Sequence, residues 1–264
     1  SDGKHEPLDA FRYFTKEWWT APPVNPPATP GLHRFVWDLH YPRPRSPSYT
    51  YSIAAVFGKD TPILPEGPFV LPGHYTVVLK AGGKTLKQPL TVTMDPRVHT
   101  SAADLQSALT FSRQVDHALA QASVDAAQQR SVTSQLEKLA GKLQHETGHA
   151  NLLTDVQAVQ AKLETPKGAK LDEAADFEAI GGILAGVESD MESADVAPNQ
   201  GQRKVLANCN ARLQRTQVDW GSLQQHALAK LDADLKAAGM PAIIVPLPAD
   251  LVMPARANGG SDLP

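Results

Sequence analysis

The chain has 264 residues, of which 42% are hydrophobic and 20% charged, and its formal net charge at pH 7 is −3. This length and composition fit one large or two ordinary globular domains, and the small net charge gives no reason to expect nucleic acid or an anionic membrane as a partner. No apolar run reaches the ~18 residues that indicate a membrane span, and the single cysteine, Cys209, excludes an intrachain disulfide.

The composition of the chain changes near residue 97. Thirteen of the sixteen aromatic residues and fifteen of the twenty-two prolines lie at or before Pro96, whereas Ala, Leu and Gln dominate after it. We therefore predict an α+β protein with two segregated parts, a β-rich part over residues 31–97 and a helical part over residues 98–240. Residues 1–30 are predicted to form an extended proline-rich wrap and residues 241–264 an extended tail, because proline lacks an amide donor and restricts the residue before it.

Alternating side chains predict antiparallel strands in the first part. The strand candidates are residues 33–39, 49–53, 74–79 and 85–94. Gly82-Gly83 predicts a hairpin turn between the last two, and Pro89 places the final strand at an edge or a bulge. About four strands are too few for a complete immunoglobulin-like sandwich, which has about seven, so we predict a partial antiparallel β-sandwich with Trp37 in its core.

Apolar residues at three- and four-residue spacing predict helices in the second part. The expected helices cover about residues 101–147, 152–164, 171–191 and 199–239. Ser101 is the expected cap of the first helix, Gly148 is expected to interrupt it, and Gly239-Met240-Pro241 is expected to end the last one. Narrow apolar stripes joined by short connections favour an antiparallel helical bundle over residues 98–240, with Cys209 as a buried structural thiol.

Several segments carry a family resemblance. They are residues 31–42 (GLHRFVWDLHYP), 67–77 (GPFVLPGHYTV), 88–98 (QPLTVTMDPRV) and 193–198 (SADVAP), the last followed by a helix that contains Trp220. Together they resemble the C-terminal region of large secreted bacterial β-propeller proteins, which carry BNR or sortilin-like repeats and are often labelled glycosyl hydrolases. The resemblance covers most of the chain and is weakest over residues 125–180.

The resemblance implies that the β part is an immunoglobulin-like domain whose first strands, together with a propeller, precede Ser1-Asp2 in a longer protein. It also implies an extracellular or periplasmic location. Because the propeller is not part of this sequence, no catalytic residue is carried over. We expect a non-catalytic interaction module that docks to a propeller fragment or a larger assembly, and a sheet with an unfilled position that a partner strand could occupy.

An alternative function comes from His145-Glu146-Thr147-Gly148-His149, which matches the H-E-x-x-H pattern. On one continuous helix the two histidines could hold zinc while Glu146 activates water, as in a zinc-dependent hydrolase. Gly148 weakens the required helix, and the metzincin extension is broken because Leu152 stands at its Gly position and Asp155 at its third His position. The candidates for a third ligand are Asp155, Glu164 and Glu173. An exposed helix end is the interpretation that the sequence favours.

A second alternative is an accessory carbohydrate-binding part of a glycoside hydrolase. Aromatic side chains that could stack on sugar rings or contact a partner are Trp18, Trp19, Tyr49 and Tyr51. An acidic turn that could take a cation, but that solvation explains more simply, contains Asp190, Glu192 and Asp195.

Overall fold

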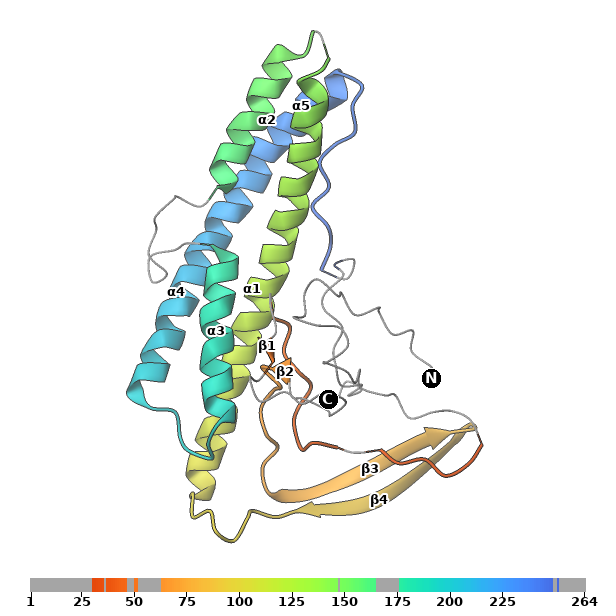
Figure 1. Ribbon diagram of the computed structural model, residues 1–264, viewed down its shortest axis with the longest axis vertical. Coiled ribbons are helices and arrows are strands. Elements are labelled where there is room, and N and C mark those ends of the chain that lie inside the picture. Colours follow the sequence, from red (N-terminus) through yellow and green to blue (C-terminus); the bar gives the residue numbers. More distant parts are fainter. Residues whose placement is uncertain are drawn as a thin grey trace.

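The computed structural model describes residues 30–35, 37–46, 50–51, 63–146, 148–164, 176–248 and 251. Figure 1 shows long helices lying side by side and a two-stranded hairpin that extends from one end of them. The described part of the chain is therefore mixed α and β, with its strands before residue 97 and its helices after it, as the sequence predicts.

The described strands form two separate antiparallel pairs. The short strand β1 (Thr50–Tyr51) pairs with β2 (Ile63–Leu64), and the long strand β3 (Gly73–Ala81) pairs with β4 (Lys84–Val92). Gly82-Gly83 connects the long pair with φ angles of 55° and 73°, the left-handed values that a tight hairpin turn requires and that glycine adopts without strain. The predicted hairpin is therefore confirmed.

The register of the β3–β4 hairpin places most of its apolar side chains on one face, with Val78 on the other. Tyr75 stands opposite Leu90 and Leu79 opposite Leu86, with Val77 between them on β3. This face is open: the exposed fractions of Val77, Leu79 and Leu86 are 52%, 55% and 60%. No second sheet covers the hairpin within the described residues, so the described strands do not confirm the predicted partial sandwich.

The strand predicted over residues 33–39 does not form in the described residues of that segment. Phe35 is 62% exposed, and the backbone of Leu39 turns sharply with a φ of 67°. A side chain as bulky as leucine seldom adopts this left-handed conformation, and an extended run cannot continue through it. Only His40 makes a β-bridge, to Phe69.

The helices of the second part pack around a shared hydrophobic core. They are α1 (Ala102–Leu143), α2 (Ala150–Leu163), α3 (Phe177–Glu192), α4 (Gln200–Ser222), η1 (Leu223–Leu228) and α5 (Ala229–Ala237). Helix α1 contacts α2 and α3, α3 contacts α4, and α2 contacts α5 (Figure 1). Among the described helices, none is both long and apolar enough to cross a membrane.

The helix boundaries follow the capping residues. The Ser101 hydroxyl accepts a hydrogen bond from the amide of Asp104 at 3.1 Å, as predicted for the start of α1. Asn199 and Gln202 form a reciprocal capping box at the start of α4. Helix α3 begins at Phe177, later than the predicted residue 171, because Asp176 caps it; residues 171–175 lie outside the described part.

The core contains the apolar stripes that the spacing predicts. Its fully buried large side chains include Val115, Leu119, Val132, Leu136, Val156, Phe177, Ile180, Leu184, Leu231 and Leu235. Cys209 is 1% exposed within the same core, which confirms the prediction of a buried thiol, and burial raises its pKa. Each such side chain contributes about 1.5 to 3 kcal/mol when fully buried.

The described residues 241–248 after α5 form no helix or strand and run along the helices, with hydrogen bonds that reach as far as Pro246 (Figure 1). The side-chain amide of Gln135 donates to the Ile244 carbonyl and accepts from the Ile244 amide, at 2.7 and 2.8 Å. The amide of Ile243 donates to Asp232 at 2.8 Å. These bonds satisfy backbone groups of a segment that pairs with no strand among the described residues.

Candidate functional site

Two segments of the β part pair with each other and dock on the helices. We call residues 38–46 and 65–72 the docked segments. The amide of Tyr41 donates to the Pro68 carbonyl and the amide of Val70 to the Leu39 carbonyl, both at 2.8 Å. The second docked segment leads directly into β3 and is paired with the first, so the contacts of both with α1 and α3 help to fix the position of the hairpin.

Gly67 allows the docked segments to approach each other closely. Its φ is 110°, and a Cβ atom at this position would lie 2.8 Å from the Tyr41 carbonyl oxygen and 3.0 Å from that of Pro42. Only glycine fits both the backbone angle and the space. Its amide points to the helices and donates to the Glu192 carboxylate at 2.7 Å.

Glu192 is the anchor for the docked segments at the end of α3. Burial raises the pKa of its carboxyl to about 7, and the amides of Gly67 and Glu66 together with the Arg43 charge oppose this shift. The expectation that Glu192 belongs to a solvated acidic turn is wrong, because its carboxylate turns inward to accept these backbone hydrogen bonds. Asp190 and Asp195 remain exposed.

Two further carboxyl groups lie behind Glu192, between α1 and α3. Glu188 is fully buried, and burial raises its pKa, as do the nearby charges of Asp116 and Glu192. The Ser112 hydroxyl lies close enough to lower this pKa in part, but no hydrogen bond of normal geometry reaches either Glu188 oxygen from the described residues. Burial also raises the pKa of Asp116, while Arg113 opposes the shift. Glu188 and Asp116 therefore keep their protons at pH values where exposed carboxyl groups are ionised.

Residues of α1 hold the first docked segment along its length. The Arg113 guanidinium lies 5.5 Å from the centre of the Tyr41 ring, a cation–π distance. Further along, the Ser123 hydroxyl lies 3.0 Å from the Arg45 carbonyl oxygen and 2.7 Å from that of Leu119. Arg43 is itself 5% exposed, so this segment is part of the packed interior.

A second group of polar side chains lies where the two docked segments meet. Asp38, His40 and Glu66 each offer one atom that could bind a metal ion, and these three atoms lie within 4.8 Å of one another. The His40 ring stacks on the Phe69 ring with centroids 3.9 Å apart. We call these three residues the Asp–His–Glu cluster.

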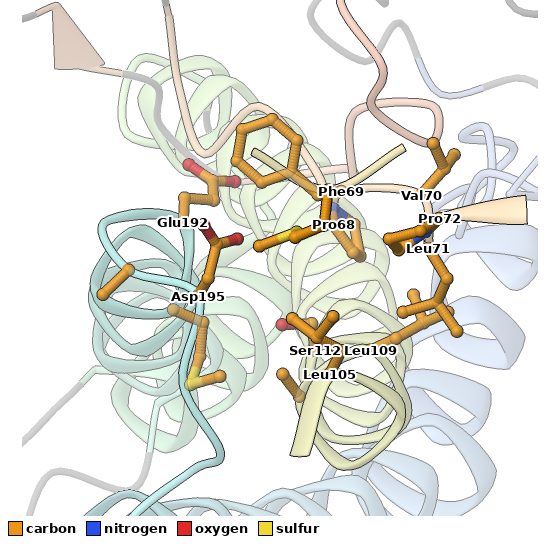
Figure 2. Close-up of a pocket in the computed structure, with 14 residues that line it drawn as sticks. Pro68, Phe69, Val70, Leu71, Pro72, Leu105, Leu109, Ser112, Glu192 and Asp195 are labelled. Carbon is orange, nitrogen blue, oxygen red and sulfur yellow. The ribbon is translucent and has the colours of Figure 1, made fainter. Parts of the chain in front are cut away.

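A small pocket lies beside the anchor. Figure 2 shows Phe69 and Leu71 from a docked segment facing Leu105 and Leu109 of α1, with Glu192 at one side. Its volume is about 70 Å³, whereas pockets for small organic ligands usually measure roughly 300 to 1,000 Å³. The pocket has room for one or two water molecules and marks the seam between the docked segments and the helices.

The residues of the H-E-x-x-H motif do not lie on one helix. Helix α1 ends at Leu143, His145 and Glu146 lie in the following turn, and His149 precedes α2. Gly148 has a φ of 96°, so the chain changes direction within the motif, and the premise of one continuous helix is wrong. Glu146 instead pairs with Lys142 at 3.7 Å.

Two of the proposed third ligands are described, and neither belongs to a group of potential metal ligands among the described residues. Asp155 pairs with Lys230 at 3.3 Å, and Glu164 follows the end of α2. Glu173 lies outside the described residues. Zinc binding through His145, Glu146 and His149 stays a prediction without the helix that motivated it.

The aromatic residues proposed for sugar or partner contact are mostly beyond the described part. Trp18, Trp19 and Tyr49 lie outside it, and Tyr51 belongs to β1. Trp37, expected in the core, is only half-buried. Its ring packs edge-on against Tyr75 with centroids 5.6 Å apart, and its indole N–H donates to the His40 carbonyl at 3.1 Å. Trp37 therefore covers one end of the apolar face of the hairpin.

Sequence reasoning missed the buried acids and the Asp–His–Glu cluster. A signal existed for Glu188, which stands four residues after Leu184 and eight after Ile180, on the apolar stripe of α3. A carboxylate on such a stripe is buried unless the helix turns away. Asp38, His40 and Glu66 had no such signal, because a local turn and a long-range pairing bring them together.

Comparison of the chain with protein-family models, with curated proteins and with solved structures finds no match. The resemblance to secreted β-propeller proteins therefore stays a prediction. What the chain does has to be inferred from its own residues and their arrangement.

Proposed function

We propose that the chain is a non-catalytic interaction module whose β3–β4 hairpin forms one part of an immunoglobulin-like sandwich completed by a partner. The open apolar face of the hairpin carries this proposal. Its side chains are Tyr75, Val77, Leu79, Leu86 and Leu90. The opposite face contains mainly polar residues, among them His74, Thr76, Lys80, Thr85, Lys87 and Thr91.

Such an amphipathic hairpin favours a covering layer on energetic grounds. An isolated two-stranded hairpin is marginally stable in water, and three or more strands or a packed face are needed for independent stability. Val77, Leu79 and Leu86 are each more than half exposed, so covering them would contribute roughly 1 kcal/mol for each side chain. These gains belong to the complex and are absent from the chain alone.

The chemistry of the face favours strands as the occupant. The apolar residues repeat every second position along β3, which matches the inner face of a second sheet packed about 10 Å away. Trp37 already occupies the Tyr75 end of this face, so the partner would extend the same layer. The proposed partner is a polypeptide that bears a β-propeller and alternating apolar strands, in the extracellular or periplasmic setting of the resemblance.

The helices would hold this face in a fixed orientation. Before β3, the docked segments bind α3 through Gly67 and Glu192. After β4, the Thr100 hydroxyl donates to the Asp195 carbonyl at 2.5 Å, just before α1 begins. Both ends of the hairpin are thus tied to the same end of the helical part, which supports a role for the proposed antiparallel bundle as a rigid support.

Site-specific photo-crosslinking tests the proposal. A benzophenone side chain placed at Val77 in the full chain, expressed in its native host, should crosslink to an extended segment of one other polypeptide. The segment should have alternating apolar residues, and Leu79→Thr/Leu86→Thr should abolish the crosslink. The same probe at Val218, which is 71% exposed on α4, is the matched control. Crosslinks only within the chain, or none above the Val218 control, would overturn the proposal.

A further inference from the structure

We propose that the Asp–His–Glu cluster is a site for a divalent transition-metal ion, with Zn²⁺ as the expected ion. The site combines one imidazole nitrogen with two carboxylate oxygens, from Asp38 and Glu66, and these atoms lie within 4.8 Å of one another. Neither the family resemblance nor the interaction function requires this site. It is also separate from the H-E-x-x-H motif.

His40 supplies an observation that is independent of the acidic residues. Its side chain is only 6% exposed, and neither ring nitrogen has a hydrogen-bond partner in the described part of the chain. The nearest approach is that of Nδ1 to the Asp38 carboxylate, at 3.7 Å. Buried polar nitrogens normally have a partner, and a metal ion bound between His40 and the carboxylates would provide one.

The backbone builds the cluster from both docked segments. The φ of 67° at Leu39 folds residues 38–40 tightly, and the His40 amide donates to the Asp38 carboxylate at 3.1 Å. The bridge between His40 and Phe69 brings the second segment, and with it Glu66, to the same place. The Phe69 ring supports the imidazole from one side. This ring contact limits the rotation of the imidazole, which favours a defined ligand geometry.

The ligand types select the ion. Zn²⁺ accepts imidazole nitrogen at about 2.0 Å and carboxylate oxygen at about 2.0 to 2.2 Å, and three protein ligands leave a fourth position for water. Ca²⁺ and Mg²⁺ prefer six or more oxygen ligands, which this cluster does not offer. Tetrahedral coordination needs ligand atoms roughly 3.3 Å apart, so atoms that now lie within 4.8 Å of one another would have to approach by up to about 1.5 Å.

The site would act as a clamp. Asp38 and His40 belong to the first docked segment and Glu66 to the second, so a bound ion would join the segments directly. The backbone of Glu66 also donates to Glu192 at the end of α3. Metal binding should therefore stabilise the base of the β3–β4 hairpin against local opening.

Zinc titration of the full chain tests the inference. Metal-free protein is titrated with Zn²⁺, Mn²⁺ and Ca²⁺ by calorimetry, and ¹⁵N spectra of the imidazole rings are recorded. We expect one tight Zn²⁺ site, much weaker Ca²⁺ binding and a shift of the His40 resonances. His40→Gln should weaken Zn²⁺ binding by more than about 100-fold, since loss of a supporting group alone costs 10- to 100-fold. His149→Ala and His74→Ala are matched controls and should leave affinity unchanged.

Three outcomes would contradict a zinc site at His40. Zn²⁺ affinity that survives in His40→Gln, or that disappears in His149→Ala, would overturn the assignment, as would unshifted His40 resonances in the wild-type chain. If His40→Gln fails to fold, Glu66→Gln removes one ligand without changing side-chain volume and should cause a comparable loss. The ¹⁵N shift of His40 in the unmodified protein decides the question in either case.

Discussion

The Gly67 amide donates to the Glu192 carboxylate at 2.7 Å and joins two residues 125 positions apart in the sequence. Gly67 belongs to the docked segment just before β3, and Glu192 is the last residue of α3. This contact is one of several that connect the β part to the helices, with the Arg113–Tyr41 and Ser123–Arg45 contacts beside it. The stability of the connection depends on a glycine conformation at one end and on a buried acid at the other.

Replacing Gly67 with alanine should destabilise the chain by about 2 to 4 kcal/mol. The new Cβ would lie 2.8 Å from the Tyr41 carbonyl oxygen, and alanine is strained at a φ of 110°. Urea unfolding measures the loss. Gly182→Ala is the matched control, because this exposed position on α3 has open space around it, and it should be neutral or stabilising by about 0.5 to 1 kcal/mol. Equal effects at both positions would contradict the close approach of the docked segments.

Replacing Glu192 with alanine should loosen the docked segments. The amides of Gly67 and Glu66 would lose their acceptor, at a cost of about 1 to 3 kcal/mol. Glu192→Gln keeps a carbonyl oxygen as acceptor and should recover most of that loss. Amide hydrogen exchange at Gly67 reports the effect directly, with faster exchange in the alanine variant. Unchanged exchange at Gly67 would show that Glu192 is not its partner in solution.

The helical part was largely predictable because its signals are local. Ser101 and the apolar spacing identified α1, and Asn199 identified α4, since capping and periodicity act within a few residues. The π-helical segment η1 was not predicted. It absorbs one extra residue between the buried Trp220 and Leu228, which stand eight positions apart rather than the seven that would continue the stripe.

The β part was predictable in pattern but not in burial. Alternation located β3 and β4, yet nothing local could show that Val77 and Leu79 remain exposed, because burial depends on whether a second layer is present. The docked segments were missed for a related reason. Their arrangement depends on the turn at Leu39 and on contact with Glu192, and both arise only after the chain has folded over a long sequence separation.

Replacing Glu188 with glutamine should change how stability depends on pH. Burial and the charges of Asp116 and Glu192 raise the pKa of Glu188 in the folded chain, so the folded state holds a proton that the unfolded state releases above about pH 4.3. The wild-type free energy of unfolding should therefore fall as pH rises above that value toward the folded pKa. Burial raises the pKa of Asp116 in the same way, and the Arg113 charge offsets only part of that rise.

Glu188→Gln lacks this titration and should unfold with a flatter pH profile. It should exceed wild-type stability by about 2 to 4 kcal/mol at pH 8 and match it within about 0.5 kcal/mol near pH 4.5. Urea unfolding at several pH values measures both curves. Glu137→Gln, on the exposed side of α1, should leave the wild-type pH profile unchanged. A parallel offset of the Glu188→Gln curve at all pH values would mean that the acid is ionised in the folded chain.

Polar substitutions on the apolar face of the hairpin should cost the isolated chain little. Leu79 and Leu86 face each other across β3 and β4 and are 55% and 60% exposed, so Leu79→Thr/Leu86→Thr should change the free energy of unfolding by less than about 0.5 kcal/mol. The same variant should bind less of a hydrophobic dye. Leu136→Ala, within the core of α1, should cost about 2 to 5 kcal/mol. A loss above about 2 kcal/mol in the double variant would mean that the chain covers this face itself, and the need for a partner layer would disappear.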